Sequence, residues 1–222
     1  YQKFKGENVK RNTGILFFIL AVVLLVTGCF SKNNGNVKKS KEKDPIVFNI
    51  GSDYKTLDPH LFSEMIGAQV DSSIFEGLLR LDENGNYTGG VAESFKEEGN
   101  KFTFKIRENA KWSDGSKITA NDFLFAFKRV LNPKTAAQFA EMLFPIKNAE
   151  AYYEGKAQEN ELGVRVIDEG TLEITLENPV SYFKYILTLP VTVPLKEEFY
   201  NIHKDKYAIK QDSFLFNGPY KI

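Results

Sequence analysis

The chain has 222 residues, of which 42% are hydrophobic and 14% aromatic, so it can bury a substantial core. Its 29 Lys and Arg residues balance its 29 Asp and Glu residues, which excludes the strongly basic character of nucleic-acid-binding proteins. One cysteine excludes an internal disulfide, and two distant histidines leave too few ligands for a zinc site. We expect a globular protein with no metal, no cofactor and no nucleic-acid partner.

The N-terminal part has the pattern of a secretion signal. Lys10-Arg11 forms a positive edge, an apolar run covers 14–26, and Cys29 follows a Val-Thr-Gly triplet. A membrane-spanning helix needs about 20 apolar residues, so a signal peptide over 1–28 fits better than a membrane span. The ending resembles the bacterial lipobox, which implies that Cys29 carries a diacylglycerol. The alternative is a buried cysteine at the end of a membrane anchor.

Two segments beside this signal carry expectations of their own. Lys5-Gly6-Glu7 would be encoded by purine-rich codons that resemble a ribosome-binding site, and Val9 can use an alternative bacterial start codon. We therefore hypothesise that residues 1–8 are untranslated. Residues 29–45 are polar and lysine-rich with few apolar side chains, so they cannot bury enough surface to offset the entropy lost on ordering. This segment is predicted to be a flexible tether.

The folded part is expected to begin near residue 46. Residues 46–50 form a mostly apolar run that ends at Gly51, which predicts a buried strand. The Asp-Pro step in Leu57-Asp58-Pro59-His60 indicates a turn, and a helix is expected from about Ala68 to Phe75. His60 has no acidic or cysteine partner at ligand spacing on a shared helix face, which favours a turn histidine over a metal or catalytic one.

The middle of the chain carries the clearest local pattern. Residues 101–106 alternate between polar and apolar, which predicts a half-buried strand after a turn at 98–100. Thr119, with Asp122 three residues later, predicts the start of a helix that ends at Asn132-Pro133.

The later part of the chain repeats the hairpin pattern. Residues 163–167 and 171–176 alternate in the same way around a turn at 168–170. Pro179 then predicts a helix that continues through Leu187, because proline is tolerated in the first helical turn.

Three phrases carry a resemblance to a known family: LDPH at 57–60, AKWSDGSKITANDFLFAFKR at 110–129 and LGVRVIDEGTLEITLENPVSYF at 162–183. With these phrases, residues from about 46 to 222 resemble extracellular solute-binding protein family 5, the oligopeptide- and dipeptide-binding receptors of ABC importers. Members typically have a Trp-Ser/Thr-Asp-Gly phrase and a Thr-Ala-x-Asp-Phe helix start, and both occur here.

The resemblance implies an α/β fold of the type II periplasmic-binding-protein architecture, in which two lobes close on the ligand. It assigns residues 46–75 and 198–222 to the first part of lobe one and residues 76–197 to an inserted α+β subdomain. The second lobe is then missing from this chain. The acidic residue that holds the amine of a bound peptide belongs to that lobe in the family, so it cannot be named.

The resemblance also implies candidate ligand-binding residues. The loop after LDPH lines the bound peptide in the family, which points to Ser63, Glu64 and Met65. The residues by themselves equally allow an exposed charge at Glu64 and a core side chain at Met65. Close relatives place a tyrosine against the peptide main chain where this sequence has Phe139, which lacks the hydroxyl donor. Either peptide selectivity differs here or Phe139 belongs to the core.

The implied function is that of a monomeric lipoprotein on the outer face of the bacterial cytoplasmic membrane, or in a periplasmic space. It would capture short peptides and deliver them to an ABC permease and its ATPase subunits. Alternatives are the same fold binding a nickel chelate, haem or sugar, because fold does not determine ligand, and a peptide sensor feeding a signalling pathway. An enzyme is not expected, because a secreted hydrolase would need a nucleophile with a base or paired carboxylates, and neither Gly-x-Ser-x-Gly nor His-Glu-x-x-His occurs.

Overall fold

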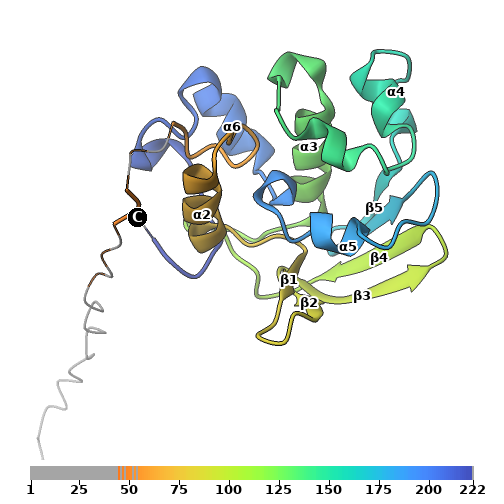
Figure 1. Cartoon of the computed structure of the whole chain (residues 1–222), viewed down its shortest axis with the longest axis horizontal. Helices are drawn as coiled ribbons and strands as arrows, with labels where there is room; N and C mark the ends of the chain where they lie inside the picture. Colours follow the sequence, from red (N-terminus) through yellow and green to blue (C-terminus); the bar gives the residue numbers. More distant parts are fainter. Residues whose placement is uncertain (1–44, 46, 48, 52, 54, 222) are drawn as a thin grey trace, which may run out of the picture. The chain divides into compact units, whose positions relative to one another are not determined.

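The computed structural model describes residues 45, 47, 49–51, 53 and 55–221. The chain divides into two units, 1–48 and 49–222, and nearly all described residues belong to the second (Figure 1). The α-helices are α2 (Met65–Ile74), α3 (Ala120–Leu131), α4 (Ala149–Tyr153), α5 (Phe183–Ile186) and α6 (Glu197–His203). The strands are β1 (Leu79–Leu81), β2 (Tyr87–Gly89), β3 (Ala92–Glu98), β4 (Lys101–Ile106), β5 (Val164–Asp168) and β6 (Thr171–Thr175). Short 3-10 helices connect them: η1 (Pro133–Thr135), η2 (Ala140–Leu143), η3 (Glu159–Glu161), η4 (Pro190–Thr192), η5 (Lys204–Lys206) and η6 (Gln211–Ser213).

The main sheet has four antiparallel strands in the order β3-β4-β6-β5. Its two central strands place apolar side chains opposite one another, with Phe102 beside Ile174 and Phe104 beside Leu172, all buried. Because successive strand residues point to opposite faces, the intervening polar residues of β4 lie on the other face. The predicted half-buried strand over 101–106 and the predicted second hairpin are confirmed.

A tight turn fixes the register of the β3–β4 hairpin. Glu98 pairs with Lys101, which leaves a two-residue loop whose first residue, Gly99, has φ +64°. A positive φ at this position is typical of a type II′ turn, which matches the twist of the flanking strands and favours glycine. The side chain of Asn100 then donates to the carbonyl of Leu176, 2.7 Å away, and ties the turn to the end of β6.

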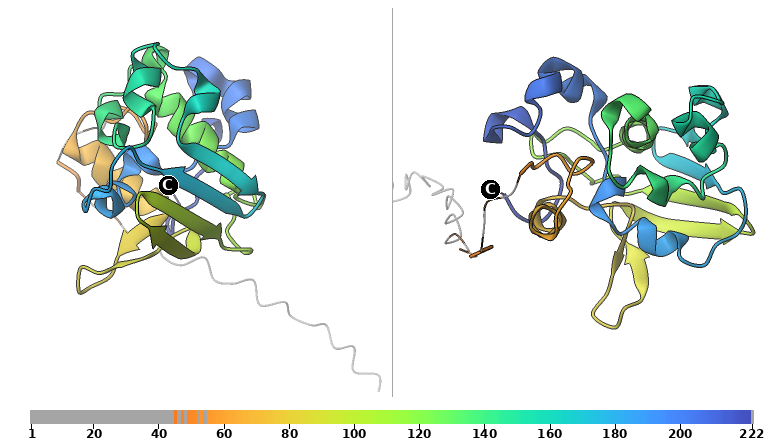
Figure 2. Two further views of the ribbon diagram at one scale, coloured as in Figure 1. Left: turned by 90° about the vertical axis from the view of Figure 1, so that its right-hand side faces the viewer. Right: turned by 45° about the horizontal axis from the view of Figure 1, so that its top comes forward.

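Helix α3 covers the apolar face of the main sheet (Figures 1 and 2). It begins at the predicted cap, where the backbone N–H of Thr119 donates to the Asp122 carboxylate at 2.7 Å. Phe123, Phe127 and Val130 are completely buried in the larger hydrophobic cluster, together with the apolar residues of β4 and β6. Burying one such side chain is worth about 1.5–3 kcal/mol, so this layer contributes most of the local stability. The predicted cap, apolar face and end of this helix are confirmed.

A second, smaller hydrophobic cluster lies under α2 and the C-terminal segments. It joins residues far apart in the sequence, including Leu57, Phe75, Leu195 and Phe214. Ala126 of α3 belongs to this cluster while Phe127 belongs to the first, so α3 contributes to both. The end of α3 is therefore placed between the two cores.

Three expectations about elements need correction. The helix predicted from about Ala68 to Phe75 starts three residues earlier, at Met65, although it then includes Gly67, a poor helix former. The helix predicted over 179–187 is reduced to α5, because Pro179 and Val180 are not helical and the turn at Ser181 and Tyr182 precedes its first residue, Phe183. Residues 46 and 48 of the predicted strand over 46–50 lie outside the described residues. The described residues Val47, Asn49 and Ile50 belong to no strand, because none of the described strands pairs with them.

Candidate functional site

The loop that precedes α2 starts with a turn at Asp58. The N–H of Leu61 donates to the carbonyl of Asp58 at 3.0 Å, and the N–H of His60 donates to the Asp58 carboxylate at 3.1 Å. This closes the predicted Asp-Pro turn and directs the chain into Ser63, Glu64 and Met65. The turn therefore sets the position of the segment that carries the three predicted ligand-binding residues.

These three residues have different environments. Ser63 is exposed, and Met65 is 86% exposed, so the alternative of a core side chain at Met65 is wrong. Glu64 is the extended residue before α2, and its carboxylate accepts the backbone N–H of Lys55 at 2.7 Å and lies 3.5 Å from the Lys55 ammonium. The loop thus presents one free polar and one free apolar side chain to solvent.

Phe139 reaches this loop through an aromatic contact. Its ring stacks on Phe62, with centroids 4.7 Å apart and an angle of 27° between the ring planes. Phe139 is half-buried and packs against the larger hydrophobic cluster, so it is partly a core residue and partly a surface one. Because Phe62 immediately precedes Ser63, the structure brings the two predicted ligand-binding segments together.

A buried polar cluster lies behind this loop. The Asp58 carboxylate accepts two hydrogen bonds from Arg129, at 2.9 Å to Nη1 and 2.5 Å to Nη2. The His60 ring links the pair to a third segment, with Nδ1 2.9 Å from Arg129 Nη1 and Nε2 3.1 Å from the carbonyl of Val193. Since a guanidinium can only donate, Nδ1 accepts and the ring proton is on Nε2, where it donates to Val193.

The burial of this cluster shifts its protonation. Desolvation, reinforced by the Arg129 charge, lowers the pKa of His60 to about 4, so the ring is neutral at neutral pH. Asp71 of α2 is completely buried nearby. Desolvation and the Asp58 charge raise the pKa of Asp71 to about 8. Desolvation alone would lower the pKa of Arg129, but the hydrogen bonds and charge of Asp58 outweigh it and raise the pKa.

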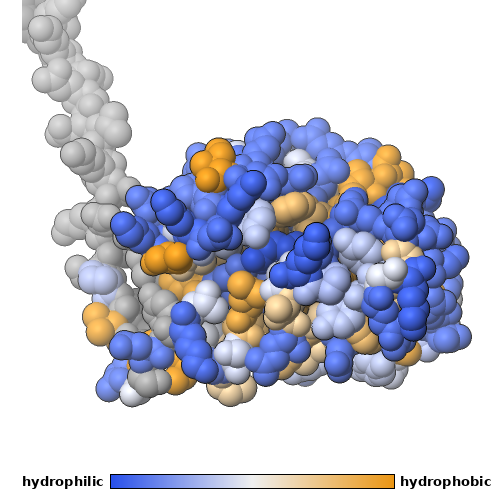
Figure 3. Space-filling view, turned by 90° about the horizontal axis from the view of Figure 1, so that it is seen from above, coloured by the Kyte–Doolittle hydropathy of each residue, from blue (hydrophilic) through white to orange (hydrophobic). Residues whose placement is uncertain are grey.

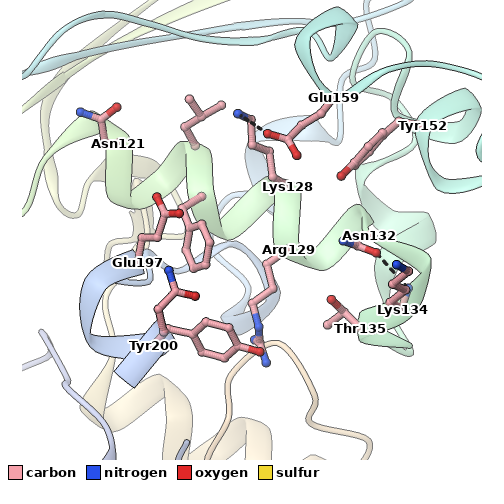
Figure 4. Close-up of a pocket in the computed structure, with 13 residues that line it drawn as sticks. Asn121, Lys128, Arg129, Asn132, Lys134, Thr135, Tyr152, Glu159, Glu197 and Tyr200 are labelled. Carbon is pink, nitrogen blue, oxygen red and sulfur yellow. Dashed lines mark hydrogen bonds and ion pairs between the residues drawn. The ribbon is translucent and has the colours of Figure 1, made fainter. Parts of the chain in front are cut away.

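A cavity of about 640 Å³ lies on the outer side of α3 (Figure 4). Lys128 points to one wall, where it pairs with Glu159 at 2.8 Å, and Arg129 extends the other way beneath the ring of Tyr200, 4.5 Å from its centroid. Seen from above, the surface is mostly hydrophilic with small separated apolar groups (Figure 3). None of the four predicted ligand-binding residues lines this cavity.

Neither a metal site nor a membrane span is found in the described part of the chain. No group of three or more His, Cys, Asp or Glu side chains there is arranged to hold a metal ion. None of the helices there has the length and apolar character that a bilayer crossing needs. Cys29 and the predicted signal peptide over 1–28 lie outside the described residues.

The interpretation of the sequence missed the pairing of Asp58 with Arg129. A signal was present, because Arg129 lies three residues after Ala126 and two helical turns after Asp122, on the buried face of α3. A charged residue on such a face requires a buried partner. The sequence pattern therefore indicates that Arg129 has an acidic partner, but it does not indicate which acidic residue that partner is.

Comparison with known proteins identifies the family. Residues 86–222, more than half of the chain, match the family described as bacterial extracellular solute-binding proteins, family 5 Middle. The chain therefore belongs to the family 5 bacterial extracellular solute-binding proteins. Its fold is accordingly the expected α/β type II architecture of periplasmic binding proteins.

Individual relatives cover most of this chain, whereas the chain covers only part of them. The periplasmic oligopeptide-binding protein OppA of Salmonella typhimurium is 33% identical over 219 residues, which are 97% of this chain and 40% of that protein. The probable deoxycholate-binding periplasmic protein YgiS of Escherichia coli is 37% identical over 177 residues, 78% of this chain and 33% of that protein. The crystal structure of an oligopeptide ABC transporter substrate-binding domain from Bacillus anthracis superposes with a TM-score of 0.72 at 43% identity, covering 74% of this chain and 32% of that one.

Proposed function

We propose that this chain is part of a receptor that captures short peptides outside the cell and delivers them to an ABC permease with its ATPase subunits. In this proposal residues 46–75 and 198–222 belong to the first lobe, residues 76–197 form an inserted subdomain, and a second lobe completes the cleft. The receptor acts as a monomer, and capture consists of closure of the two lobes on the peptide.

The observation that carries the proposal is the stack of Phe62 on Phe139. It joins two segments that are distant in the sequence into one surface, on which Ser63 and Met65 are exposed. An exposed loop of this kind offers backbone N–H and C=O groups to an extended peptide. Recognition of peptide main chain in this way tolerates many side-chain sequences. The relatives named for oligopeptides support the same ligand class.

Phe139 has a particular role in this proposal. A phenylalanine ring supplies apolar area but no hydroxyl donor, so its contact with the peptide consists of packing alone. We therefore propose that Phe139 favours peptides that place an apolar side chain or the flat face of a peptide bond over the ring.

Native mass spectrometry of the receptor, containing this chain from residue 30 onward together with its second lobe, tests the ligand class. A ladder of co-purified adducts with the masses of two- to five-residue peptides is the expected result. The 222-residue chain alone should bind the same peptides much more weakly, because half of the contacts come from closure. Tight binding of peptides by the chain alone would contradict this division of the site.

A second ligand class has one observation in its favour. YgiS, which is named as a probable deoxycholate-binding protein, resembles this chain as closely as the oligopeptide-binding relatives do. A single adduct of the mass of a bile acid, a nickel chelate, haem or a sugar in the same experiment would keep the fold and replace the ligand. A neighbouring set of permease and ATPase genes would favour uptake over a sensor role.

We also propose that Cys29 carries a lipid that anchors the receptor to the outer face of the cytoplasmic membrane. The support is the charged edge, apolar run and lipobox-like ending that precede Cys29 in the sequence. Metabolic labelling with a radioactive fatty acid should label the wild-type protein but not Cys29→Ala, which should fold normally and leave the membrane fraction. Labelling that persists in Cys29→Ala would refute the anchor.

A further inference from the structure

We propose that Arg129 is a positioning residue: through Asp58 and His60 it holds the loop with Ser63, Glu64 and Met65 against the Phe139 segment in the geometry that captures ligand. This inference rests on the proposed function, because it assigns a role in the same site. Arg129 itself is not proposed to touch the ligand.

Arg129 connects α3 to the loop before α2. It lies in the last turn of α3, and its two Nη atoms bind the Asp58 carboxylate of the loop before α2. The two side chains are only 6% and 4% exposed, so water does not compete for these bonds. A paired, planar guanidinium constrains the direction of its partner as well as its distance. The orientation of the Asp58 turn is thus set by α3.

The neutral His60 ring joins a third segment, at Val193, to the Asp58–Arg129 pair. It accepts from Arg129 and donates to the carbonyl of Val193 beyond η4. Cation–π contact with Tyr200 of α6 holds the guanidinium from the other side (Figure 4). Arg129 is therefore contacted from two directions, by Asp58 and His60 of the loop and by Tyr200 of α6.

The segments that Arg129 connects also carry the candidate ligand-binding residues. The segment that contains Phe139 follows α3 directly, through η1, while Phe62 lies two residues after His60. The ion pair and the aromatic stack therefore connect the same two segments at two places. Ser63 and Met65 are exposed, so we infer that their positions follow from these two contacts of the loop with the rest of the fold.

Stability alone is a weaker explanation of this pair. Replacing a buried ion pair by apolar side chains of similar volume is often neutral or stabilising, whereas removing one partner leaves an uncompensated charge. Positioning and stability can therefore be separated experimentally. A double replacement keeps the volume and removes both charges, so it should retain the fold while losing the directional constraint on the loop.

The experiment compares Asp58→Leu/Arg129→Met with a matched pair, Lys128→Met/Glu159→Leu, which removes the partly exposed ion pair made by the neighbouring residue of α3. Hydrogen exchange is measured on the 222-residue chain over residues 61–67 and 136–141, with β4 as the reference for global stability. If the capture-competent loop conformation falls to about a tenth of the population, the apparent Kd of the two-lobed receptor for peptide should rise about tenfold. Hydrogen exchange in the loop should then approach the rate of an unprotected segment, because the loop is open most of the time. The matched pair should change neither.

The outcomes are distinct. Unchanged loop exchange in a folded double variant, or altered exchange with an unchanged Kd, would overturn the positioning role. If wild-type receptor binds no peptide, the proposed function fails, while the exchange measurement on the chain still tests the positioning. Should the double variant not fold, Arg129→Lys decides, because lysine keeps the charge but loses the two-pronged geometry. Loop exchange must then rise while exchange in β4 stays at the wild-type value.

Discussion

Phe62 and Phe139 stack with their ring centroids 4.7 Å apart, and this contact holds the loop before α2 against the segment that follows η1. The geometry is offset rather than edge-on, with 27° between the rings. Aromatic pairs of this kind contribute about 0.5–1.5 kcal/mol beyond the area that they bury. A contribution of this size can be measured by substitution, and its loss should leave the chain folded.

A double-mutant cycle should measure this contact. Phe62→Ala and Phe139→Ala should each destabilise the chain, and the double variant should lose less than their sum, with a coupling free energy of about 1 kcal/mol in urea unfolding. As a control, Phe139→Ala combined with Phe95→Ala should be additive, because Phe95 stacks on Phe104 across the sheet instead. Additive losses for the Phe62 and Phe139 pair would show that the rings act independently.

The turn between β3 and β4 should be destabilised by any L-amino acid side chain at its first position, Gly99. Gly99→Ala should cost about 1–2 kcal/mol of unfolding free energy, because an alanine at φ +64° is strained although no atom lies within 4 Å of its Cβ. Gly170→Ala is the matched control in the β5–β6 turn, where φ is not positive and the nearest atom is 3.7 Å from the added Cβ. It should be neutral or stabilise slightly. Equal effects at the two positions would mean that backbone conformation is not the cause.

The first turn of α3 should depend on Asp122. Asp122→Ala removes the acceptor for the Thr119 N–H and should lower the unfolding free energy by about 1 kcal/mol, the usual cost of losing a helix cap. The neighbouring exposed Asn121 provides the comparison, since Asn121→Ala keeps the cap and improves helix propensity. Thermal unfolding followed by circular dichroism measures both. A stability loss in Asn121→Ala as large as that in Asp122→Ala would argue against the cap.

The buried groups His60 and Asp71 should change the unfolding free energy in opposite directions as the pH rises. The pKa of Asp71 is raised from 3.8 to about 8, so the folded state holds the proton more tightly and stability falls as pH rises between these values. The pKa of His60 is lowered from 6.5 to about 4, so the unfolded state binds the extra proton and stability rises over that range. The two slopes oppose one another between pH 4 and 6.5, and the fall due to Asp71 alone remains between 6.5 and 8.

Asp71→Asn isolates one of these contributions. The unfolding free energy of the variant minus that of the wild type should increase steadily between pH 4 and 8, because only the wild type loses stability through Asp71. Ser72→Ala, an exposed change on the same helix that removes no titratable group, should give a flat difference. Urea unfolding at several pH values measures both curves. A flat difference for Asp71→Asn would mean that the carboxyl is ionised at all these pH values.

Several features were predictable because the information for them is local. The alternation in β4, the turn at Gly99, and the cap and apolar face of α3 each depend on residues within a few positions of one another. Their hydrogen bonds close within the segment or with the next strand, so the residue pattern determines them. The family phrases are equally local, and they led to the correct family and fold class.

Features that depend on distant partners were not predictable in this way. The starts of α2 and α5 were missed for a different reason, because local residue patterns indicate the existence of a helix better than its ends. The sequence by itself determined the hairpins, the central helix and the family. Only the tertiary structure decided that Arg129 pairs with Asp58, 71 residues away, and that Phe139 meets Phe62. The physical reason is that burial demands a partner for a charge or a ring, but the choice among candidates depends on which segments the two hydrophobic cores bring together.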